Sequence, residues 1–236
     1  MTETDVRVSV ADDESVVAVH HEAPSDDWIA FCHGFLSDKT GSYEHRCRRA
    51  VERGYNAVRF DFRGCGESDG QFVEQTLSDK LADLQAVVDH FDPPSLALFG
   101  SSFGGKVAFH TAVRDERVEA VVTRAPVTYN DAFDEYRSIV ADEGECRFDT
   151  GDRIDQRFFD DFDAYPFADV EASLSVPVAI FHGDTDDSVP VDFSFEAASN
   201  LETDVLLETF AGEGHRFSRD AEDRLLDRTF HWLETV

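Results

Sequence analysis

Lysine is scarce in this sequence, and basic residues as a whole are outnumbered by acidic ones. The 236 residues include 21 Lys and Arg, of which only three are lysines, against 50 Asp and Glu, for a formal net charge of -29. Nucleic-acid binding requires a basic surface that neutralises phosphates. We therefore expect neither a nucleic acid nor an anionic membrane surface to be a partner of this chain.

The acidic residues are distributed along the whole chain rather than gathered in one tail. Self-repulsion of this kind is reduced when high salt screens the charges. The composition resembles that of cytoplasmic proteins from salt-accumulating halophiles, and an ordinary acidic, soluble protein is the alternative. A salt titration of folding separates the two.

Cysteines are few, and long apolar runs are absent. The four cysteines form no Cys-x-x-Cys pair and have no histidine at metal-site spacing. We expect four free thiols and no metal site. Residues 1–10 lack the basic and apolar stretches of a signal peptide, and no run is long enough to span a bilayer. These features predict a cytoplasmic location.

Short β-branched runs alternate with helical patterns along the chain, which indicates an α/β protein. The first two runs, 5–10 and 15–20, flank an acidic turn and predict an antiparallel hairpin. Six later runs are nearly all apolar, as in parallel strands buried on both faces; they cover residues 28–32, 57–61, 95–99, 118–123, 178–182 and 205–210. Helical patterns cover residues 42–53, 76–91, 103–113 and 219–233. We predict a single domain over residues 1–236, built on an eight-stranded, mostly parallel twisted sheet flanked by helices.

Residues 125–175 interrupt this alternation. They contain no strand candidate but nine aromatic residues, and connections of this length are usually functional lids or small subdomains. We predict a small helical cap inserted after the sixth strand. Its rings either form an apolar pocket for an acyl or aryl group or pack the cap onto the sheet, and the sequence does not decide between them.

A candidate nucleophile lies between the run 95–99 and the helix 103–113. Gly100, Ser102 and Gly104 form a G-x-S-x-G pattern in this strand-to-helix turn. Small residues on both sides allow the close chain approach that such a strained turn requires. The helix N-terminus favours developing negative charge. A Gly/Ser-rich strand-to-helix turn that binds a phosphate, or that only reverses the chain, is the alternative for this motif alone.

A serine nucleophile requires a base and an acid that orients the base. His215 lies in a glycine-containing loop directly after the last predicted strand, and Asp184, Asp186 and Asp187 follow the run 178–182. All of them fall at the carboxyl edge of the predicted sheet. The order Ser, Asp, His along the chain is the order found in α/β-hydrolases. The three placements agree, which favours a catalytic serine at position 102.

The oxyanion of the tetrahedral intermediate requires N–H donors. We assign them to the backbone N–H groups of Phe35, after the run 28–32, and of Phe103, the residue after the nucleophile. A tight turn braced by His33 is the alternative for the segment His33-Gly34-Phe35.

Together these motifs make the chain resemble α/β-hydrolases of the esterase, thioesterase and lipase type over nearly its whole length. Residues 33–35 resemble the HG-x oxyanion motif, and residues 59–70 are similar to a segment of feruloyl-esterase-like and depalmitoylase-like members. In the family pattern the acid precedes Val-Pro by three residues, which implies Asp186. Cys65 departs from the His that many relatives carry there, and this affects the expected substrate range.

The resemblance implies a serine hydrolase with the triad Ser102, Asp186 and His215. We expect it to cleave carboxylic esters or thioesters of short to medium or aromatic acyl groups through an acyl-enzyme, with a small-molecule substrate and without cofactor or metal. Asp61 is expected to cap a turn rather than to take part in the chemistry. A serine peptidase of the same fold and a non-catalytic binding module are the alternatives, and the sequence indicates no oligomeric state.

Overall fold

The fold is known from a computed structural model, which describes residues 2–11 and 13–236. Its central sheet has eight strands in the order β1-β2-β4-β3-β5-β6-β9-β10. Their bounds are β1 Glu3–Ala11, β2 Glu14–His21, β3 Trp28–Cys32, β4 Asn56–Phe60, β5 Leu96–Ser101, β6 Val118–Arg124, β9 Val178–Gly183 and β10 Val205–Phe210. Strand β2 runs antiparallel to β1 and β4, and the other neighbours are parallel. The predicted eight-stranded, mostly parallel sheet is confirmed.

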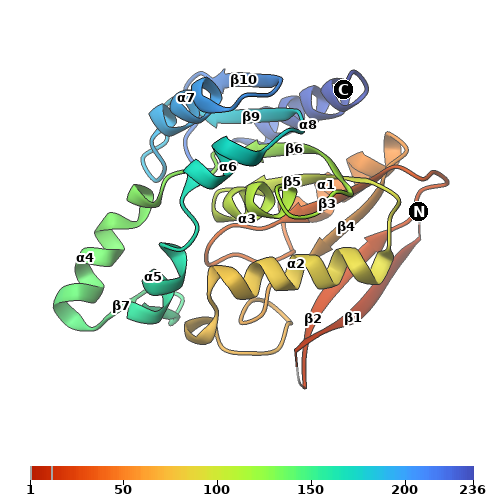
Figure 1. The fold of residues 1–236 in the computed structure, drawn as a ribbon. Helices are drawn as coiled ribbons and strands as arrows, with labels where there is room; N and C mark the ends of the chain where they lie inside the picture. Colours follow the sequence, from red (N-terminus) through yellow and green to blue (C-terminus); the bar gives the residue numbers. More distant parts are fainter. Residues whose placement is uncertain (1, 12) are drawn as a thin grey trace.

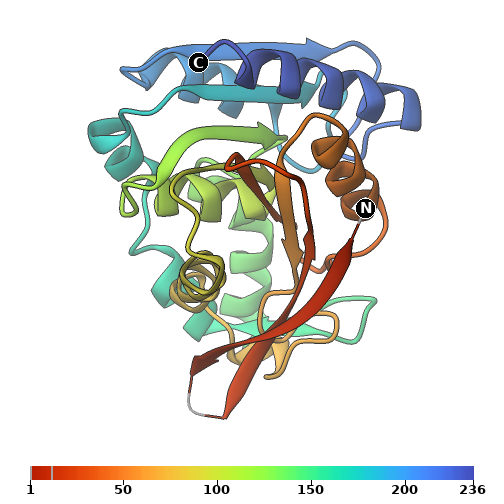
Figure 2. The same ribbon diagram turned by 90° about the vertical axis from the view of Figure 1, so that its right-hand side faces the viewer.

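Helices cover both faces of the sheet, because successive side chains of each buried strand point to opposite sides. On one face, Ile29 and Phe31 pack with residues of α1 (Ser42–Glu52) and α8 (Arg219–Leu233). On the other, Ala30 and Cys32 pack with residues of α2 (Leu77–Phe91), α3 (Phe103–Ala112) and α7 (Val191–Asn200). Figures 1 and 2 show this arrangement, with the β1–β2 hairpin reaching beyond the neighbouring strands.

The segment 125–175 lies between β6 and β9 and extends to the lower left in Figure 1. After the short helix η2 it contains helices and two strands; their bounds are η2 Asn130–Phe133, α4 Asp134–Glu143, β7 Glu145–Arg147, β8 Arg153–Asp155, α5 Gln156–Phe162 and α6 Phe167–Ser173. Strands β7 and β8 pair antiparallel. The prediction that this segment contains no strand was wrong, because three-residue strands rich in charged side chains carry no readable apolar pattern.

An aromatic cluster joins the segment 125–175 to the sheet. The ring of Phe35 is at its centre, with centroid distances between 5.1 and 6.4 Å to six other rings. These rings belong to Phe72, Phe103, Phe133, Tyr136, Phe148 and Phe158. Phe72, on the short helix η1 (Phe72–Glu74), is buried, as are Phe103, Phe133 and Phe158. The rings therefore pack against one another. This agrees with the alternative in which they pack the segment in place.

The loop after β4 is organised around Asp61, which is fully buried. Its carboxylate accepts hydrogen bonds from the backbone N–H of Lys39 at 2.6 Å, from Lys39 Nζ at 2.7 Å and from the backbone N–H of Glu67 at 2.9 Å. A Cβ added to Gly66 would lie 2.2 Å from Asp61 Oδ2. The structural role predicted for Asp61 is confirmed.

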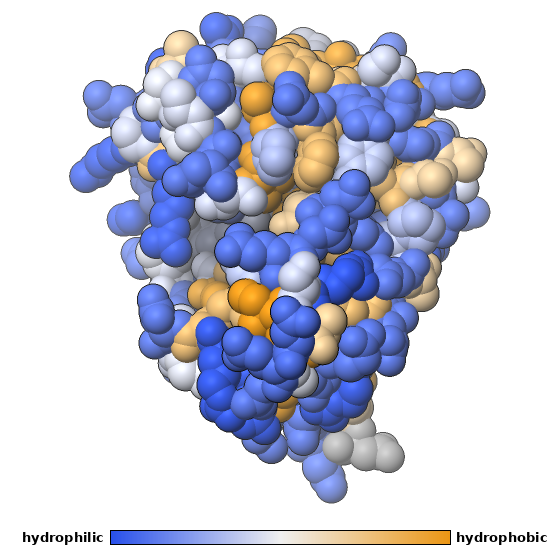
Figure 3. Space-filling model, turned by 90° about the vertical axis from the view of Figure 1, so that its left-hand side faces the viewer, coloured by the Kyte–Doolittle hydropathy of each residue, from blue (hydrophilic) through white to orange (hydrophobic). Residues whose placement is uncertain are grey.

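The four cysteines are free thiols, as predicted, and all four are buried. Burial raises the pKa of the Cys32 and Cys47 thiols well above their ordinary value. Among the helices of residues 2–11 and 13–236, none combines the length and the apolar character needed to cross a membrane. Hydrophilic residues cover most of the face shown in Figure 3, and apolar residues occupy smaller, separate areas.

Candidate active site

Ser102 lies between β5 and α3 in a backbone conformation that few residues other than glycine adopt. Its φ is 54° and its ψ is -119°. Such a conformation costs free energy and persists where the surrounding structure fixes it. The N–H of Ser102 donates to Arg124 O at 2.9 Å, and its carbonyl accepts from the N–H groups of Gly105 at 2.9 Å and Val127 at 3.0 Å. These three hydrogen bonds hold the turn.

The glycines two residues before and after Ser102 are required by close packing of the backbone. A Cβ added to Gly100 would lie 2.3 Å from the carbonyl oxygen of Gly104. A Cβ added to Gly104 would lie 2.3 Å from the carbonyl oxygen of Cys32, on the neighbouring strand. The G-x-S-x-G pattern is thus explained by contacts within and across the turn.

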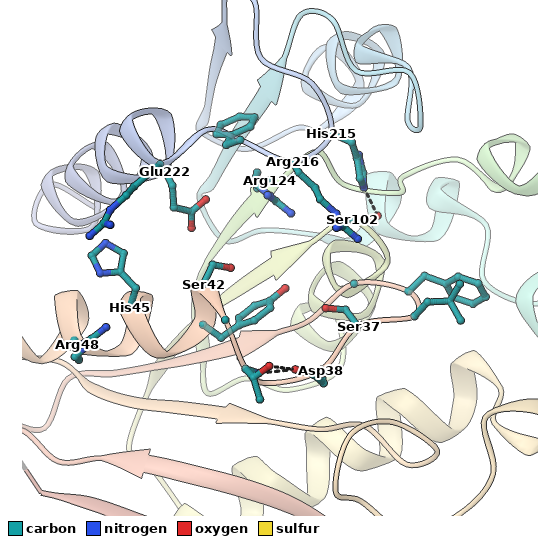
Figure 4. A pocket seen from close by; sticks show the side chains of 18 residues that line it. Ser37, Asp38, Ser42, His45, Arg48, Ser102, Arg124, His215, Arg216 and Glu222 are labelled. Carbon is teal, nitrogen blue, oxygen red and sulfur yellow. Dashed lines mark hydrogen bonds between the residues drawn. The ribbon is translucent and has the colours of Figure 1, made fainter. Parts of the chain in front are cut away.

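Three side chains from distant parts of the sequence form a hydrogen-bonded chain. Ser102 Oγ lies 3.0 Å from Nε2 of His215, and Nδ1 of His215 lies 2.7 Å from Oδ2 of Asp186. Ser102, Asp186 and His215 follow β5, β9 and β10, so all three lie at the carboxyl edge of the sheet. Figure 4 shows His215 turned toward Ser102. The structure brings together the three residues that the sequence indicated.

The other two candidate aspartates form hydrogen bonds with loop residues other than His215. Asp184 Oδ1 accepts the backbone N–H of Gly212 at 2.7 Å, and Asp187 Oδ1 lies 3.3 Å from Ser188 Oγ. Of the three aspartates, Asp186 is the one that contacts His215.

Asp186 is a buried carboxylate surrounded by donors. Oδ1 accepts the backbone N–H groups of Ser188 at 2.8 Å and Val189 at 2.9 Å. Burial opposes ionisation of Asp186, but the hydrogen bonds from His182, His215 and the Val189 N–H outweigh it and hold the pKa of Asp186 well below its usual range. The carboxylate is therefore charged and able to orient the imidazole of His215.

His182 is a neighbour of Asp186 for which no role was predicted. Its Nε2 lies 3.2 Å from Asp186 Oδ2 and 3.0 Å from Val189 O, and its Nδ1 lies 2.7 Å from Ser194 Oγ. A carboxylate and a carbonyl are both acceptors, so Nε2 carries the proton and Nδ1 accepts from the Ser194 hydroxyl. The signal in the sequence was the position of His182 at the end of β9, four residues before Asp186.

The loop after β3 is braced by His33, which is buried. Its Nε2 accepts the backbone N–H of Phe62 at 3.1 Å, so the proton is on Nδ1, which donates to Gly34 O at 2.9 Å. Burial lowers the pKa of His33 to about 4, and the ring is neutral at pH 7. The bracing role considered for His33 is thus supported by the structure.

The backbone at Gly34 and Phe35 passes beside Ser102. A Cβ added to Gly34 would lie 3.3 Å from Ser102 Cβ and 3.9 Å from Ser102 Oγ. The N–H of Phe35 has no hydrogen-bond acceptor among the described residues. Phe103 begins α3, and the first N–H groups of a helix have no partner within it. Two unused donors therefore lie close to Ser102.

Ser102 and His215 open into a pocket of about 760 Å³. Its walls come from the loop after β3, the start of α1, the end of β6 and the segment leading into α8, and most of the side chains that line it are polar. Across residues 2–11 and 13–236, no group of three His, Cys, Asp or Glu side chains is arranged to hold a metal ion.

Comparison with known families decides the family of this chain. The sequence profile of the prolyl oligopeptidase family matches residues 42–236. The chain belongs to the prolyl oligopeptidase family. This member is 28% identical over 216 residues to a palmitoyl-protein thioesterase, ABHD10 of Pongo abelii, with 84% of this chain and 70% of that protein covered. The ABHD10 protein of Homo sapiens is 27% identical with the same coverage.

Solved structures share the fold of this prolyl oligopeptidase family member. A putative hydrolase from Agrobacterium vitis S4 has a TM-score of 0.76 and 25% identity, with 97% of this chain and 98% of that chain covered. Est1E from Butyrivibrio proteoclasticus with bound ferulic acid has a TM-score of 0.84 and 18% identity, with 98% and 100% covered. Mouse α/β-hydrolase domain-containing protein 10 has a TM-score of 0.81 and 21% identity, with 98% of both chains covered.

These findings confirm the predicted α/β-hydrolase fold. The family member described here is a hydrolase with thioesterase relatives.

Proposed function

We propose that this chain hydrolyses carboxylic esters or thioesters through an acyl-enzyme formed on Ser102. The observation that carries the proposal is the hydrogen-bonded chain from Ser102 through His215 to the buried, charged Asp186. This arrangement matches the geometry by which a serine hydroxyl is activated as a nucleophile.

In the first half of the reaction, His215 Nε2 accepts the proton of the Ser102 hydroxyl while Oγ attacks the carbonyl carbon. The unused N–H groups of Phe35 and Phe103 donate to the oxyanion. Asp186 stabilises the imidazolium of His215. The intermediate collapses as the bond to the alcohol or thiol breaks, and His215 returns the proton to the leaving group. In the second half, His215 takes a proton from a water molecule as the water oxygen attacks the acyl carbon. The bond from this carbon to Ser102 Oγ then breaks, His215 returns the proton to Oγ, and the acid is released.

For the acyl group we propose short to medium chains or aromatic acids. A long alkyl chain requires an extended apolar lining, whereas polar residues dominate the pocket at Ser102. We also propose that the segment 125–175 is a cap within one domain spanning residues 1–236. Its rings pack on Phe35, whose N–H we assign to the oxyanion.

A fluorophosphonate probe tests the nucleophile. We expect a single adduct on Ser102, located by mass spectrometry, and no adduct in Ser102→Ala. Ser101→Ala is the matched control, because it removes the neighbouring hydroxyl, and it should keep the adduct at Ser102. Hydrolysis of 4-nitrophenyl esters that survives Ser102→Ala would overturn the proposal. A series of 4-nitrophenyl esters of increasing length, with feruloyl esters and acyl-CoA, defines the acyl preference.

A serine peptidase is the second candidate, because the family that matches residues 42–236 is the prolyl oligopeptidase family. The same residues would carry out that reaction, so Ser102→Ala abolishes either activity. Matched esters and peptide 4-nitroanilides distinguish the two. We expect the ester to be cleaved and the anilide to be left intact, and a comparable rate on the anilide would favour the peptidase.

A further inference from the structure

The pocket at Ser102 has a charge opposite to that of the rest of the chain. Four arginines but only two carboxylates, Asp38 and Glu222, line it, in a protein with a formal net charge of -29. The arginines are Arg48, Arg124, Arg216 and Arg219. Figure 4 shows Arg124 between Glu222 and Ser102, with Arg216 extending toward Ser102. A local excess of positive charge beside a reactive serine requires an explanation.

Arg124 lines the pocket and is hydrogen-bonded through its backbone to the turn that carries Ser102. It ends β6, and its carbonyl accepts the N–H of Ser102 at 2.9 Å. Its side chain is partly buried, with the guanidinium 5.7 Å from the ring centroid of Phe217. The buried Nε of Arg124 has no hydrogen-bond partner among the described residues. A buried donor without a partner costs free energy comparable to a lost hydrogen bond.

The nearest carboxylate is already engaged by another arginine. Glu222 forms an ion pair with Arg46, which is fully buried and also donates to Ser101 Oγ at 2.8 Å. Glu222 therefore faces two guanidinium groups, those of Arg46 and Arg124, and forms an ion pair with Arg46 alone. The buried Arg63, by contrast, is paired with a carboxylate and lies 2.6 Å from Asp83.

The remaining charges at the pocket do not remove this excess. Asp38, whose Oδ1 accepts the N–H of Thr40 at 2.7 Å and also contacts the Thr40 hydroxyl, offsets one of the four positive charges. Arg216 and Arg219 are exposed and form no ion pair within the described residues. Arg48 lies 3.8 Å from Glu44 across one helical turn, a contact that contributes little at the surface.

We infer that this pocket binds an anionic group, a carboxylate or a phosphate, carried by the ester or thioester that Ser102 attacks. The inference rests on the proposed function. Arg124 and Arg216 are the residues that bind this group, because a planar guanidinium donates two parallel hydrogen bonds to either oxyanion. The bound anion would supply the hydrogen-bond partner that Arg124 Nε lacks. The free energy lost by burying this donor without a partner would then be recovered in the complex.

Two matched substrate pairs test the inference and separate the two anions. The carboxylate pair is 4-nitrophenyl hemisuccinate with 4-nitrophenyl butyrate; the phosphate pair is acetyl-CoA with the neutral thioester S-acetyl-N-acetylcysteamine. We expect kcat/KM of the wild type to be higher for the anionic member of one pair, and that pair identifies the anion. Arg124→Gln should lower kcat/KM for the preferred anionic substrate about 10- to 100-fold, as loss of a charged hydrogen bond does.

A second pocket variant and a control variant complete the test. Arg216→Ala removes an exposed side chain from the pocket and should also lower the preference for the anionic substrate. It keeps the inference testable if Arg124→Gln fails to fold. Arg228→Ala removes the same charge from α8 outside the pocket, where Arg228 pairs with Glu208 at 3.4 Å, and should leave the preference unchanged. The inference is overturned if neither anionic member is preferred, or if the pocket variants lower both members of a pair equally.

Equilibrium binding separates this inference from the proposed function. Calorimetric titration of Ser102→Ala with succinate, inorganic phosphate and coenzyme A should show binding that Arg216→Ala weakens. If anions bind in this way but the wild type shows no Ser102-dependent hydrolysis, the anion site is supported and the proposed reaction is rejected. Ser102-dependent hydrolysis of neutral and anionic esters at equal rates, with no anion binding, would retain the reaction and reject the site.

Discussion

Nε2 of His182 lies 3.2 Å from Oδ2 of Asp186, the same carboxylate oxygen that faces His215 at 2.7 Å. His182 reaches neither Ser102 nor the pocket, so it acts through the carboxylate. Because its Nε2 carries a proton, His182 fixes the position of Asp186 and favours its ionised form. We therefore regard His182 as a positioning residue.

Replacement of His182 should affect turnover more than binding. We expect His182→Ala to lower kcat for an ester about 10-fold with little change in KM, because a less firmly held carboxylate orients His215 less well. His182→Gln supplies an N–H donor and should recover part of the loss. Ser194→Ala, which removes the hydrogen bond to Nδ1, should have a smaller effect. An unchanged kcat in folded His182→Ala would reject the role.

The assignment of the acid is tested by three parallel substitutions. Asp186→Asn removes the charge that stabilises the His215 imidazolium and should lower kcat about 1000- to 10000-fold. Asp184→Asn and Asp187→Asn remove the same charge from the same loop without contact to His215 and should remain within a few-fold of the wild type. Steady-state kinetics with one 4-nitrophenyl ester, with circular dichroism to confirm folding, distinguish the three. A large loss in either neighbour would contradict the assignment.

Lys106 predicts a pH dependence of stability. Burial lowers the pKa of this α3 lysine from 10.5 to about 7, and the distant Asp163 only partly offsets the effect. Between these two values the unfolded chain holds a proton that the folded chain has released. The free energy of unfolding should therefore rise with pH in this interval, by at most about 1.4 kcal/mol per pH unit.

Lys106→Met isolates this contribution. Urea unfolding of both proteins at pH 7, 8 and 9 should give a smaller pH-dependent gain for the variant, because titration of the other groups is common to both. Parallel curves for the two proteins would show that Lys106 stays charged in the folded state, held by Asn130 Oδ1 at 2.7 Å.

High salt should stabilise this protein, as the proposed halophilic origin requires. Salt weakens exposed ion pairs such as Arg137–Asp163, at 2.7 Å, but each of these contributes less than about 1 kcal/mol. Repulsion within a net charge of -29 acts over the whole surface and is screened as the Debye length falls from about 10 Å at 0.1 M to about 3 Å at 1 M. The second effect should dominate.

Chemical unfolding across a KCl series measures the effect of salt. Sucrose is the control, since it favours the compact state without screening charge. If the free energy of unfolding stays constant or falls as the KCl concentration rises, the halophilic origin is rejected and the protein is an ordinary acidic one.

The sequence predicted those parts of the structure that depend on local patterns. The eight strands were readable because their apolar runs are buried on both faces, and Ser102 was readable because its turn requires Gly100 and Gly104. Helix α7 was missed because its inward face consists of small residues, Ser194 and Ala197, without an apolar stripe.

The charge of the pocket could not be read from the sequence. Arg48, Arg124 and Arg216 are far apart in the chain and meet only because α1, β6 and the segment before α8 converge on one side of Ser102. The contact of His182 with Asp186 depends likewise on the path of the loop after β9. Such relationships follow from tertiary packing, which single-sequence patterns do not encode.

Phe35 belongs to two parts of the molecule at once. Its N–H lies beside Ser102, and its ring packs on Phe133 at 5.2 Å and on Phe158 at 5.7 Å, both in the segment 125–175. Laboratory evolution of that segment toward new acids should therefore trade selectivity against turnover, because each repacked ring shifts the oxyanion donor. Arg48 and Arg219 line the pocket without belonging to this aromatic packing, so mutations there should change the preference for an anionic substrate without the same loss of turnover.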